Sequence, residues 1–430
     1  MNSPDLLVFA PADHPRLRFV LDWMVSEGWE KTVDLTTDLD VARNWPGPKM
    51  AYSAEDPQFR PWIPMAGQLL FGDNTTSEPD VVRLEDEFWL FAASQPNASL
   101  PADLLAACFW MLSRWEEYGD FTPDAHDRYP GKASLGFRHH FLMCPVVDEW
   151  TARLAGLLNH HFPGFAVPPA SFHRIQTFDI DFAWRYLHKP VVRQIRTLAR
   201  DLIKQGRTTF RRGFECLTDG RRDPYDFFDQ WKEEEAVLFF PVSSRSHFDR
   251  NHSWMHPAYQ QVIRSCHEHT RIGIHPGYSA GSHPEHLAEE CRRFAMITGE
   301  SPSRSRMHYL RFRLPETYRL LIECGIQEDW SMGFADQPGF RAGTARSFFW
   351  YDLERDITTP LRVHPFQVMD TTLQGYLHMH PQAALALIGQ LESTIRAHGG
   401  TLTTLAHANS LAAIDREWAG WETVFFSKDR

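Results

Sequence analysis

Two aspartates that follow an apolar run are the residues in this sequence best suited to chemistry. The run TFDID at residues 177–181 places its two carboxylates two positions apart. In an extended strand, residues i and i+2 point to the same face, so Asp179 and Asp181 are expected to project together from the end of a buried strand. Metal-dependent hydrolases keep a base and a metal ligand in such a position, so the run predicts a hydrolase.

Three histidines stand in comparable places further along the chain. His275 follows the apolar run RIGI, His308 lies within SRMHY, and His407 ends the run TLTTLAH. Imidazole and carboxylate groups are the ligands that zinc commonly takes in proteins. Acid and His side chains at successive strand ends therefore indicate a metal-centred site.

The elements that must position these side chains alternate between strand and helix. Strands are expected at residues 175–180, 236–240, 272–274, 306–312 and 401–405. Helices are expected at residues 284–298, 315–324 and 381–398. Alternation of this kind, with polar residues at strand carboxyl ends, predicts a parallel α/β barrel.

The N-terminal part of the chain reads differently. Short strands are expected at residues 6–10 and 88–92, and the segment 102–115 is apolar on nearly every face, which predicts a buried helix. The Pro-rich segment 162–169 marks a boundary. We therefore expect an accessory α+β domain over residues 1–165 and the barrel over residues 166–430.

Composition argues against two classes of main partner. The 430 residues carry a net charge of −11, which argues against nucleic acid, or an anionic membrane surface, as the main partner. The basic segment 189–222 is the exception, because residues 191–200 predict a helix with a cationic face. That face is either a solvated surface or a docking surface for an acidic protein partner or lipid headgroups.

Cysteine usage and the lack of targeting signals favour a cytoplasmic protein. The six cysteines show no paired spacing, so neither a zinc knuckle nor a disulfide framework is expected. The first residues do not resemble a secretory leader, and no run of about 18 apolar residues predicts a membrane span.

In content and order, the C-terminal motifs resemble those of the polysaccharide deacetylases, the carbohydrate esterase family 4 type. The resemblance implies a distorted (β/α) barrel with a divalent metal, usually zinc. It makes Asp179 the base and Asp181 a metal ligand. The family's second motif has a His four residues before another His; this sequence keeps His275 and has Ser279 in the second place. We expect His308 to replace the missing ligand.

The remaining motifs of the family are matched more loosely. Arg306 stands at the third motif, Trp330 in the aromatic wall motif, and His407 in the final Leu-x-His motif, whose His is the general acid. The runs LSRWEEY at residues 112–118 and GFRAGT at residues 339–344 resemble a branch of the family from bacterial surface-polysaccharide loci, which carries a related N-terminal domain.

Amide hydrolysis explains why these residue types would be needed together. Zinc held by Asp181, His275 and His308 keeps an open position and lowers the pKa of bound water towards about 7. Asp179 would accept the water's proton, and His407 would protonate the leaving amine. Further expected roles are a backbone N–H near Tyr309 for the oxyanion, Arg306 or Arg341 to orient Asp179, and Trp330, Phe340 or Tyr278 to stack on a sugar. The expected substrate-binding residues are Arg306, Tyr309, Trp330 and Arg341.

The expected activity is removal of an N-acetyl group from a sugar of a polysaccharide or glycolipid precursor. Ser279 keeps open a non-catalytic carbohydrate-binding or scaffold protein on a decayed barrel. Hydrolysis of another small C–N bond, as in relatives that act on allantoin-like or cyclic imide substrates, is a third possibility. A cluster of His247, His252 and His256 beside Asp249 is read as chance neighbours in a His-rich loop.

Overall fold

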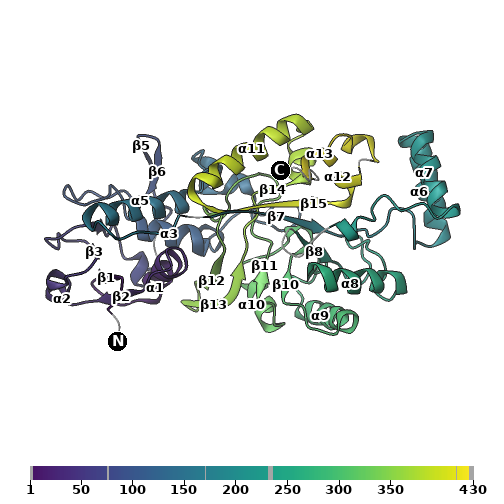
Figure 1. Cartoon of the computed structure of the whole chain (residues 1–430). Helices are drawn as coiled ribbons and strands as arrows, with labels where there is room; N and C mark the ends of the chain where they lie inside the picture. Colours follow the sequence, from purple (N-terminus) through teal and green to yellow (C-terminus); the bar gives the residue numbers. More distant parts are fainter. Residues whose placement is uncertain (1–2, 75–76, 170, 231–235, 413, 426–430) are drawn as a thin grey trace.

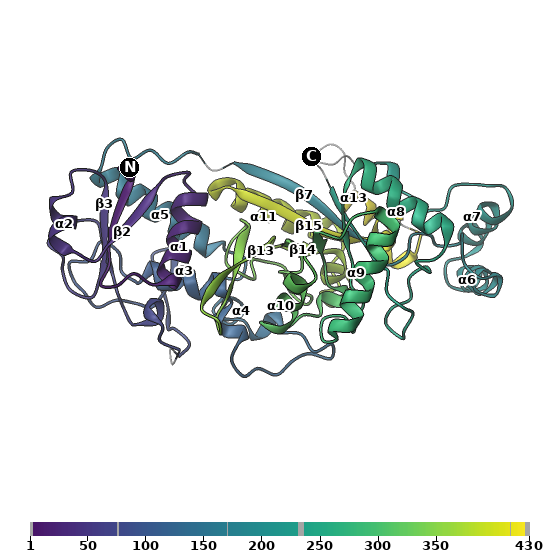
Figure 2. The same ribbon diagram turned by 90° about the horizontal axis from the view of Figure 1, so that it is seen from below.

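The computed structural model describes residues 3–74, 77–169, 171–230, 236–412 and 414–425. The molecule is elongated, with the N-terminal part at one end and a large sheet in the middle (Figures 1 and 2). Two helices project from the other end: α6 (Val191–Lys204) and α7 (Arg207–Thr218).

The N-terminal part is built on a four-stranded parallel sheet with the order β2-β1-β3-β4. Its strands are β1 (Leu6–Phe9), β2 (Val33–Thr36), β3 (Lys49–Ser53) and β4 (Trp62–Pro64). A separate hairpin consists of β5 (Val81–Leu84) and β6 (Glu87–Leu90). The helices are α1 (Pro15–Leu21), α2 (Leu39–Asn44), α3 (Leu104–Ser113), α4 (Leu135–Arg138) and α5 (Val146–His161). Every residue of α3 is buried, as its apolar character predicts.

The large sheet has nine strands in the order β12-β13-β11-β10-β9-β8-β7-β15-β14. They are β7 (Phe172–Asp179), β8 (Ala236–Phe240), β9 (Arg271–Ile274), β10 (Arg304–Ser305), β11 (Glu328–Asp329), β12 (Phe348–Asp352), β13 (Ile357–Val363), β14 (Val368–Met369) and β15 (Gly400–His407). Neighbouring strands are parallel except in the β12–β13 hairpin. The fold is thus mixed α/β with parallel sheets. Within the described residues no ladder joins β12 to β14, so a closed barrel is not shown.

Helices lie between and after these strands, three of them at or close to the expected residues 284–298, 315–324 and 381–398. They are α8 (Pro257–His269), α9 (Pro284–Thr298), α10 (Glu316–Glu323) and α11 (Pro381–His398), followed by α12 (Ala408–Ala412) and α13 (Glu422–Phe425). Proline opens α8, α9 and α11, where its missing N–H removes no helical hydrogen bond. The expected bounds of α9 and α11 are confirmed.

The register of the central strands brings their carboxyl ends into one row. Asp179 of β7 is paired with His407 of β15 on one side and with Phe239 of β8 on the other. The next residue of β8, Phe240, is paired with Ile274 of β9, which is paired with Ser305 of β10. Side chains that follow these positions therefore meet at one edge of the sheet.

The strand expected over residues 306–312 is wrong. Strand β10 ends at Ser305, and the backbone of Tyr309 and Leu310 adopts left-handed φ angles of 60° and 55°. Extended strands require negative φ, so the chain turns here instead of continuing the sheet. The β12–β13 hairpin, for its part, was not expected from the sequence.

Buried polar contacts join the N-terminal part to the large sheet. The Arg341 guanidinium donates two hydrogen bonds to the Glu117 carboxylate, at 2.6 and 2.9 Å, and both side chains are buried. The Asp148 carboxylate accepts hydrogen bonds from the Thr344 hydroxyl and the Ala345 N–H. Apolar residues of both parts also belong to one continuous core.

In the part of the chain that the structure describes, none of the helices is both long enough and apolar enough to cross a bilayer.

Candidate functional site

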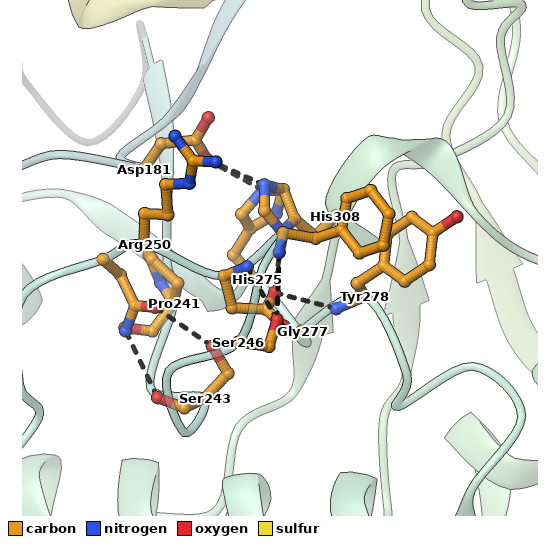
Figure 3. Close-up of polar contacts among 12 residues, drawn as sticks. Asp181, Pro241, Ser243, Ser246, Arg250, His275, Gly277, Tyr278 and His308 are labelled. Atoms are coloured by element: carbon orange, nitrogen blue, oxygen red, sulfur yellow. Dashed lines mark hydrogen bonds and ion pairs between the residues drawn. The ribbon is translucent and has the colours of Figure 1, made fainter. Parts of the chain in front are cut away.

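One carboxylate and two imidazoles converge at the edge where β7, β9 and β10 end. Nε2 of His275 lies 3.3 Å from Oδ1 of Asp181, and Nε2 of His308 lies 3.5 Å from the same oxygen. One ligand atom from each residue falls within 4.8 Å of the others, a spacing that suits a shared metal ion. Figure 3 shows the two rings next to each other, with Asp181 facing them. The structure therefore brings together the three expected ligands.

The hydrogen bonds behind the two imidazoles prepare their Nε2 atoms for a metal. Nδ1 of His275 donates to the Arg306 carbonyl at 2.7 Å, and Nδ1 of His308 donates to Oδ1 of Asp249 at 3.0 Å. A proton on Nδ1 leaves the Nε2 lone pair directed at the cluster, which is the arrangement of metal-binding histidines. Nε2 of His275 and Oδ1 of Asp181 are buried without a hydrogen-bond partner. Because buried polar atoms rarely stay unsatisfied, these residues fit a bound cation.

The electrostatics of the cluster favour a charged carboxylate. Burial alone would raise the pKa of Asp181, but His308, His275 and His407 together lower it well below its usual range. Burial would likewise lower the pKa of His308, yet Asp181 and Asp249 outweigh it and raise this pKa. The Asp181 carboxylate and the His308 imidazole thus stabilise each other's charged forms. A bound cation would take the place of the imidazole proton in this interaction.

Asp179 lies beside the three-residue cluster but is held by a different group. Its Oδ1 lies 3.6 Å from Nη1 of Arg306, and its Oδ2 lies 3.8 Å from Nε2 of His275. Arg306 is fully buried, and its Nη2 donates to Oγ1 of Thr177 at 2.8 Å. One guanidinium nitrogen of Arg306 thus lies near Asp179 at ion-pair distance, without a hydrogen bond and without the bidentate contact that was a possibility.

His407 faces the cluster from the opposite side and forms a dyad with Asp370. Nδ1 of His407 donates to Oδ1 of Asp370 at 2.8 Å, and Nε2 lies 4.0 Å from Oδ2 of Asp181. Burial would lower the pKa of His407, but Asp370, Asp181 and Asp179 outweigh it and raise the pKa to about 10. The ring is thereby held as a proton donor that points towards the cluster.

A cavity of about 300 Å³ opens onto the cluster. Asp181, His308 and Tyr309 line it together with Phe248 and Arg250, among others. The ring of Phe248 stacks on Tyr278 with their centroids 3.9 Å apart, and Tyr309 meets both rings edge-on. The cavity thus combines an aromatic wall with the polar cluster, which suits a small polar group attached to a ring.

The N-terminal part reaches this cavity through the loop after α3. Arg128 donates from Nη1 to the Tyr309 carbonyl at 2.7 Å and from Nη2 to the Tyr376 hydroxyl at 2.9 Å. His126 contacts the Tyr278 hydroxyl through Nδ1 at 3.2 Å. Residues from before the expected boundary therefore fix the left-handed turn at Tyr309.

Three residues singled out by the sequence are placed away from the cluster. Trp330 is buried and stacks on His364, with ring centroids 4.1 Å apart. Arg341 is occupied by its ion pair with Glu117. Ser279 lies on the surface, where its hydroxyl bonds Nδ1 of His286 at 2.8 Å. We leave Trp330 and Arg341 out of the candidate site, and Ser279 does not stand where a ligand would be needed.

Other residues at the site were not found from the sequence. Asp370 follows the two-residue strand β14, which is too short for an apolar run that would indicate a strand end. In the sequence Asp249 is only a neighbour of histidines that are read as chance neighbours, and Phe248 carries no signal. His247, His252 and His256 do not join a potential metal group within the described residues.

Comparisons with known proteins give one match to a family model, over part of the chain. A family model described as a family of unknown function (DUF7033) matches residues 6–163. A search of curated protein sequences finds no significant match.

Three solved structures resemble parts of the chain. A candidate polysaccharide deacetylase from Mycobacterium smegmatis is 15% identical, over 60% of this chain and 84% of that protein, with a TM-score of 0.37. A GH57 branching enzyme from Thermococcus kodakaraensis is 8% identical over 60% and 68%, with a TM-score of 0.33. A mutant of a CE4 family pseudoenzyme with restored activity is 12% identical over 57% and 68%, with a TM-score of 0.23. Because all three TM-scores are low, the function proposed below is drawn from the side chains of this chain.

Proposed function

We propose that this protein is a metal-dependent hydrolase that removes an N-acetyl group from a sugar of a polysaccharide or glycolipid precursor. The observation that carries the proposal is the convergence of the Asp181–His275–His308 cluster with two further groups, Asp179 and the His407–Asp370 dyad. A binding protein needs neither an acid nor a base at such a cluster, whereas amide hydrolysis needs both.

A divalent metal, most simply Zn²⁺, would be held by one carboxylate oxygen of Asp181 and by Nε2 of His275 and His308. Such an ion polarises a carbonyl oxygen and makes water nucleophilic at neutral pH. His308 takes the place that the resemblance leaves vacant at Ser279. The Arg306 carbonyl accepts a hydrogen bond from His275, and the Asp249 carboxylate accepts one from His308, so each would fix the orientation of one ring.

Asp179 is the base in this proposal. It would accept a proton from the water whose oxygen adds to the acetyl carbonyl carbon. Arg306 keeps this carboxylate oriented and offsets its negative charge, while Arg306 itself stays out of contact with substrate. The N–H of Tyr309, carried by the left-handed turn at the cavity wall, is the candidate donor to the developing oxyanion.

His407 is the acid. When the carbon–nitrogen bond breaks, its Nε2–H would donate a proton to the departing nitrogen, which yields the free amine of the sugar and acetate. Asp370 fixes the ring tautomer and stabilises the protonated form, so the proton is available at neutral pH.

The proposal extends to the fold and the substrate. The parallel part of the large sheet, with its site at strand carboxyl ends, would be a distorted deacetylase-type barrel over residues 166–430, preceded by a domain over residues 1–165. Phe248 and Tyr309 are the candidates to contact the sugar ring, and the cavity of about 300 Å³ leaves room for an acetamido group.

Metal content of the purified protein tests the proposal. We expect about one zinc ion per chain in the wild type, and its loss in Asp181→Ala and in His308→Ala. His283→Ala, which removes an exposed histidine, serves as the matched control and should keep the metal. Acetate release from N-acetylated sugars should depend on the same two residues.

Two results would contradict the proposal. A wild-type protein that binds no metal after reconstitution would favour the binding-only protein. If His308→Ala keeps its metal, His308 is not a ligand and only lines the cavity.

A further inference from the structure

The α6–α7 hairpin projects from the end of the molecule (Figures 1 and 2). The two helices pack on each other and stand in the chain between β7 and β8. We use the name α6–α7 hairpin for residues 191–218.

One face of α6 is apolar although it is exposed. Val191 and Leu202 are eleven residues apart, as are Val192 and Ile203, so each pair lies on one side of the helix about three turns apart. Ile203 is 82% exposed and Val191 is 67% exposed. Exposed side chains of this size in a row are unusual for a surface that faces only water.

The neighbouring face of the α6–α7 hairpin is cationic. Two acidic residues, Asp201 and Glu215, stand against seven basic ones: Arg193, Arg196, Arg200, Lys204, Arg207, Arg211 and Arg212. Asp201 is buried and pairs with Arg185 of the body as well as with Arg200. Within the described residues, the side chains of Arg193, Arg196 and Lys204 form no ion pair. The rest of the chain is acidic, since the whole protein has a net charge of −11.

A buried ion-pair network connects the α6–α7 hairpin to the rest of the chain. The Arg185 guanidinium donates to both carboxylate oxygens of Asp201 on α6 and to both of Asp415 near the C-terminus. The Tyr186 hydroxyl donates to Asp201 as well. These contacts tie α6 to the body at Asp201.

The α6–α7 hairpin lies on the side of the candidate site. It follows the carboxyl end of β7, where Asp181 is, and both views show it beyond that end of the strand. Basic residues continue from it towards the cavity. Burial first, and then the nearby cations Arg193 and Arg250, lower the pKa of the Arg245 guanidinium, and Arg250 lines the cavity.

We propose that the α6–α7 hairpin docks the protein on the surface of an anionic lipid bilayer. An exposed apolar strip beside a cationic face is the surface of a helix that lies in the interface, with apolar side chains among the acyl chains and basic ones at the headgroups. The acidic remainder of the chain is repelled by such a surface, so the protein meets it through this hairpin. The candidate site, at the same end of β7, is then on the side of the molecule that meets the lipid layer, so the proposed function would act on a substrate carried there.

Co-sedimentation with vesicles tests the docking surface without using catalytic activity. We expect the wild type to bind vesicles that contain phosphatidylglycerol, to bind pure phosphatidylcholine vesicles far less, and to be released by salt. Each basic side chain near an anionic surface contributes on the order of fivefold to binding. Arg196→Glu/Lys204→Glu should therefore reduce partitioning more than tenfold, and Val192→Ser/Ile203→Ser should reduce it at any salt concentration.

The matched control is Arg153→Glu/Arg292→Glu, which reverses two exposed charges on α5 and α9. It should bind as the wild type does, and thermal melting should show that all variants fold. Equal binding of the Arg196→Glu/Lys204→Glu variant would overturn the proposal. Equal binding of the wild type to both kinds of vesicle would overturn it too. No binding at low salt, with a dimer that Ile203→Ser dissociates, would assign the apolar strip to a second copy of the chain instead. Because metal content is not measured here, these outcomes are independent of the proposed hydrolysis.

Discussion

The carboxylate of Asp370 holds His407 from two directions. One oxygen accepts the Nδ1–H of the ring at 2.8 Å, and the other accepts the backbone N–H of His407 at 2.7 Å and the Ser410 hydroxyl at 2.6 Å. Because a carboxylate only accepts, the ring must carry its proton on Nδ1, and Nε2 is the atom that faces the site.

Replacing Asp370 should therefore impair the acid without removing the metal. In Asp370→Asn the amide can present an N–H to the ring, which favours the wrong tautomer. We expect kcat to fall by about 10²- to 10⁴-fold on an N-acetylated sugar. Elemental analysis should find the wild-type metal content, and Ser410→Ala, which removes only a hydrogen bond to the carboxylate, should lose less activity. Full activity in Asp370→Asn would exclude His407 as the acid.

Asp249 should tune metal affinity through His308. Its carboxylate orients the ring and makes Nε2 a better ligand, so Asp249→Asn should weaken metal binding by about 10- to 100-fold. Titration against a competing chelator measures this change. The exposed Asp219→Asn variant should bind metal as the wild type does. Unchanged affinity in Asp249→Asn would show that His308 does not ligate.

Arg128 should act on the reaction from the N-terminal part. Loss of its hydrogen bond frees the Tyr309 carbonyl and loosens the left-handed turn at the cavity wall. We expect Arg128→Ala to lower kcat/KM by roughly tenfold, on the order of 1.4 kcal/mol for one charged hydrogen bond, with the metal retained. Arg138→Ala, on the same part of the chain, is the control.

The Glu117–Arg341 pair should matter for stability and not for metal binding. Removing Arg341 leaves the buried Glu117 carboxylate with Arg114 as its remaining cation, so Arg341→Ala should lower the free energy of unfolding by about 1.5–3 kcal/mol through the lost charged hydrogen bonds. Urea unfolding measures this loss. An Arg341→Met/Glu117→Leu double variant should lose less, since the Glu117 carboxylate is gone and Arg114 still pairs with Glu116. A smaller effect in Arg341→Ala than in the double variant would contradict this account.

His252 should make the protein sensitive to mild acid. Burial, and then Lys189, lower its pKa from 6.5 to about 3, so between these values the unfolded chain binds a proton that the folded chain does not. Stability is therefore complete above about pH 6.5 and falls as the pH falls towards 3, by at most about 1.4 kcal/mol per pH unit. His252→Phe, which keeps a ring against Trp184, should flatten this dependence in unfolding measured between pH 7 and about 4.5. The exposed His269→Phe should not.

Much of the site could be predicted because its residues end apolar runs. Asp179, Asp181, His275 and His407 follow strands that periodicity reveals, and parallel strands bring their carboxyl ends to one edge. The local pattern around His308 does not predict a ligand, because it indicates a strand where the structure has a turn. His308 is expected as a ligand only because Ser279 leaves the motif without its second His.

The features that the sequence does not predict depend on contacts between residues that are far apart in the chain. Arg341 stands in a loop between two glycines, which suggests a residue of the functional site. Nothing near it in the sequence indicates that its partner is Glu117. Asp370 follows a strand of two residues, too short for any periodicity. Whether the large sheet closes into a barrel, and that β12 pairs with β13, likewise depend on strand pairings that local patterns do not encode.

The Glu117–Arg341 pair also bears on how the chain folds as it is synthesised. Arg341 leaves the ribosome 224 residues after Glu117. Until then only Arg114 is at hand to compensate that buried carboxylate. The N-terminal part therefore cannot complete its native contacts while it emerges, and folding in order of synthesis gives way to late, joint folding of both parts.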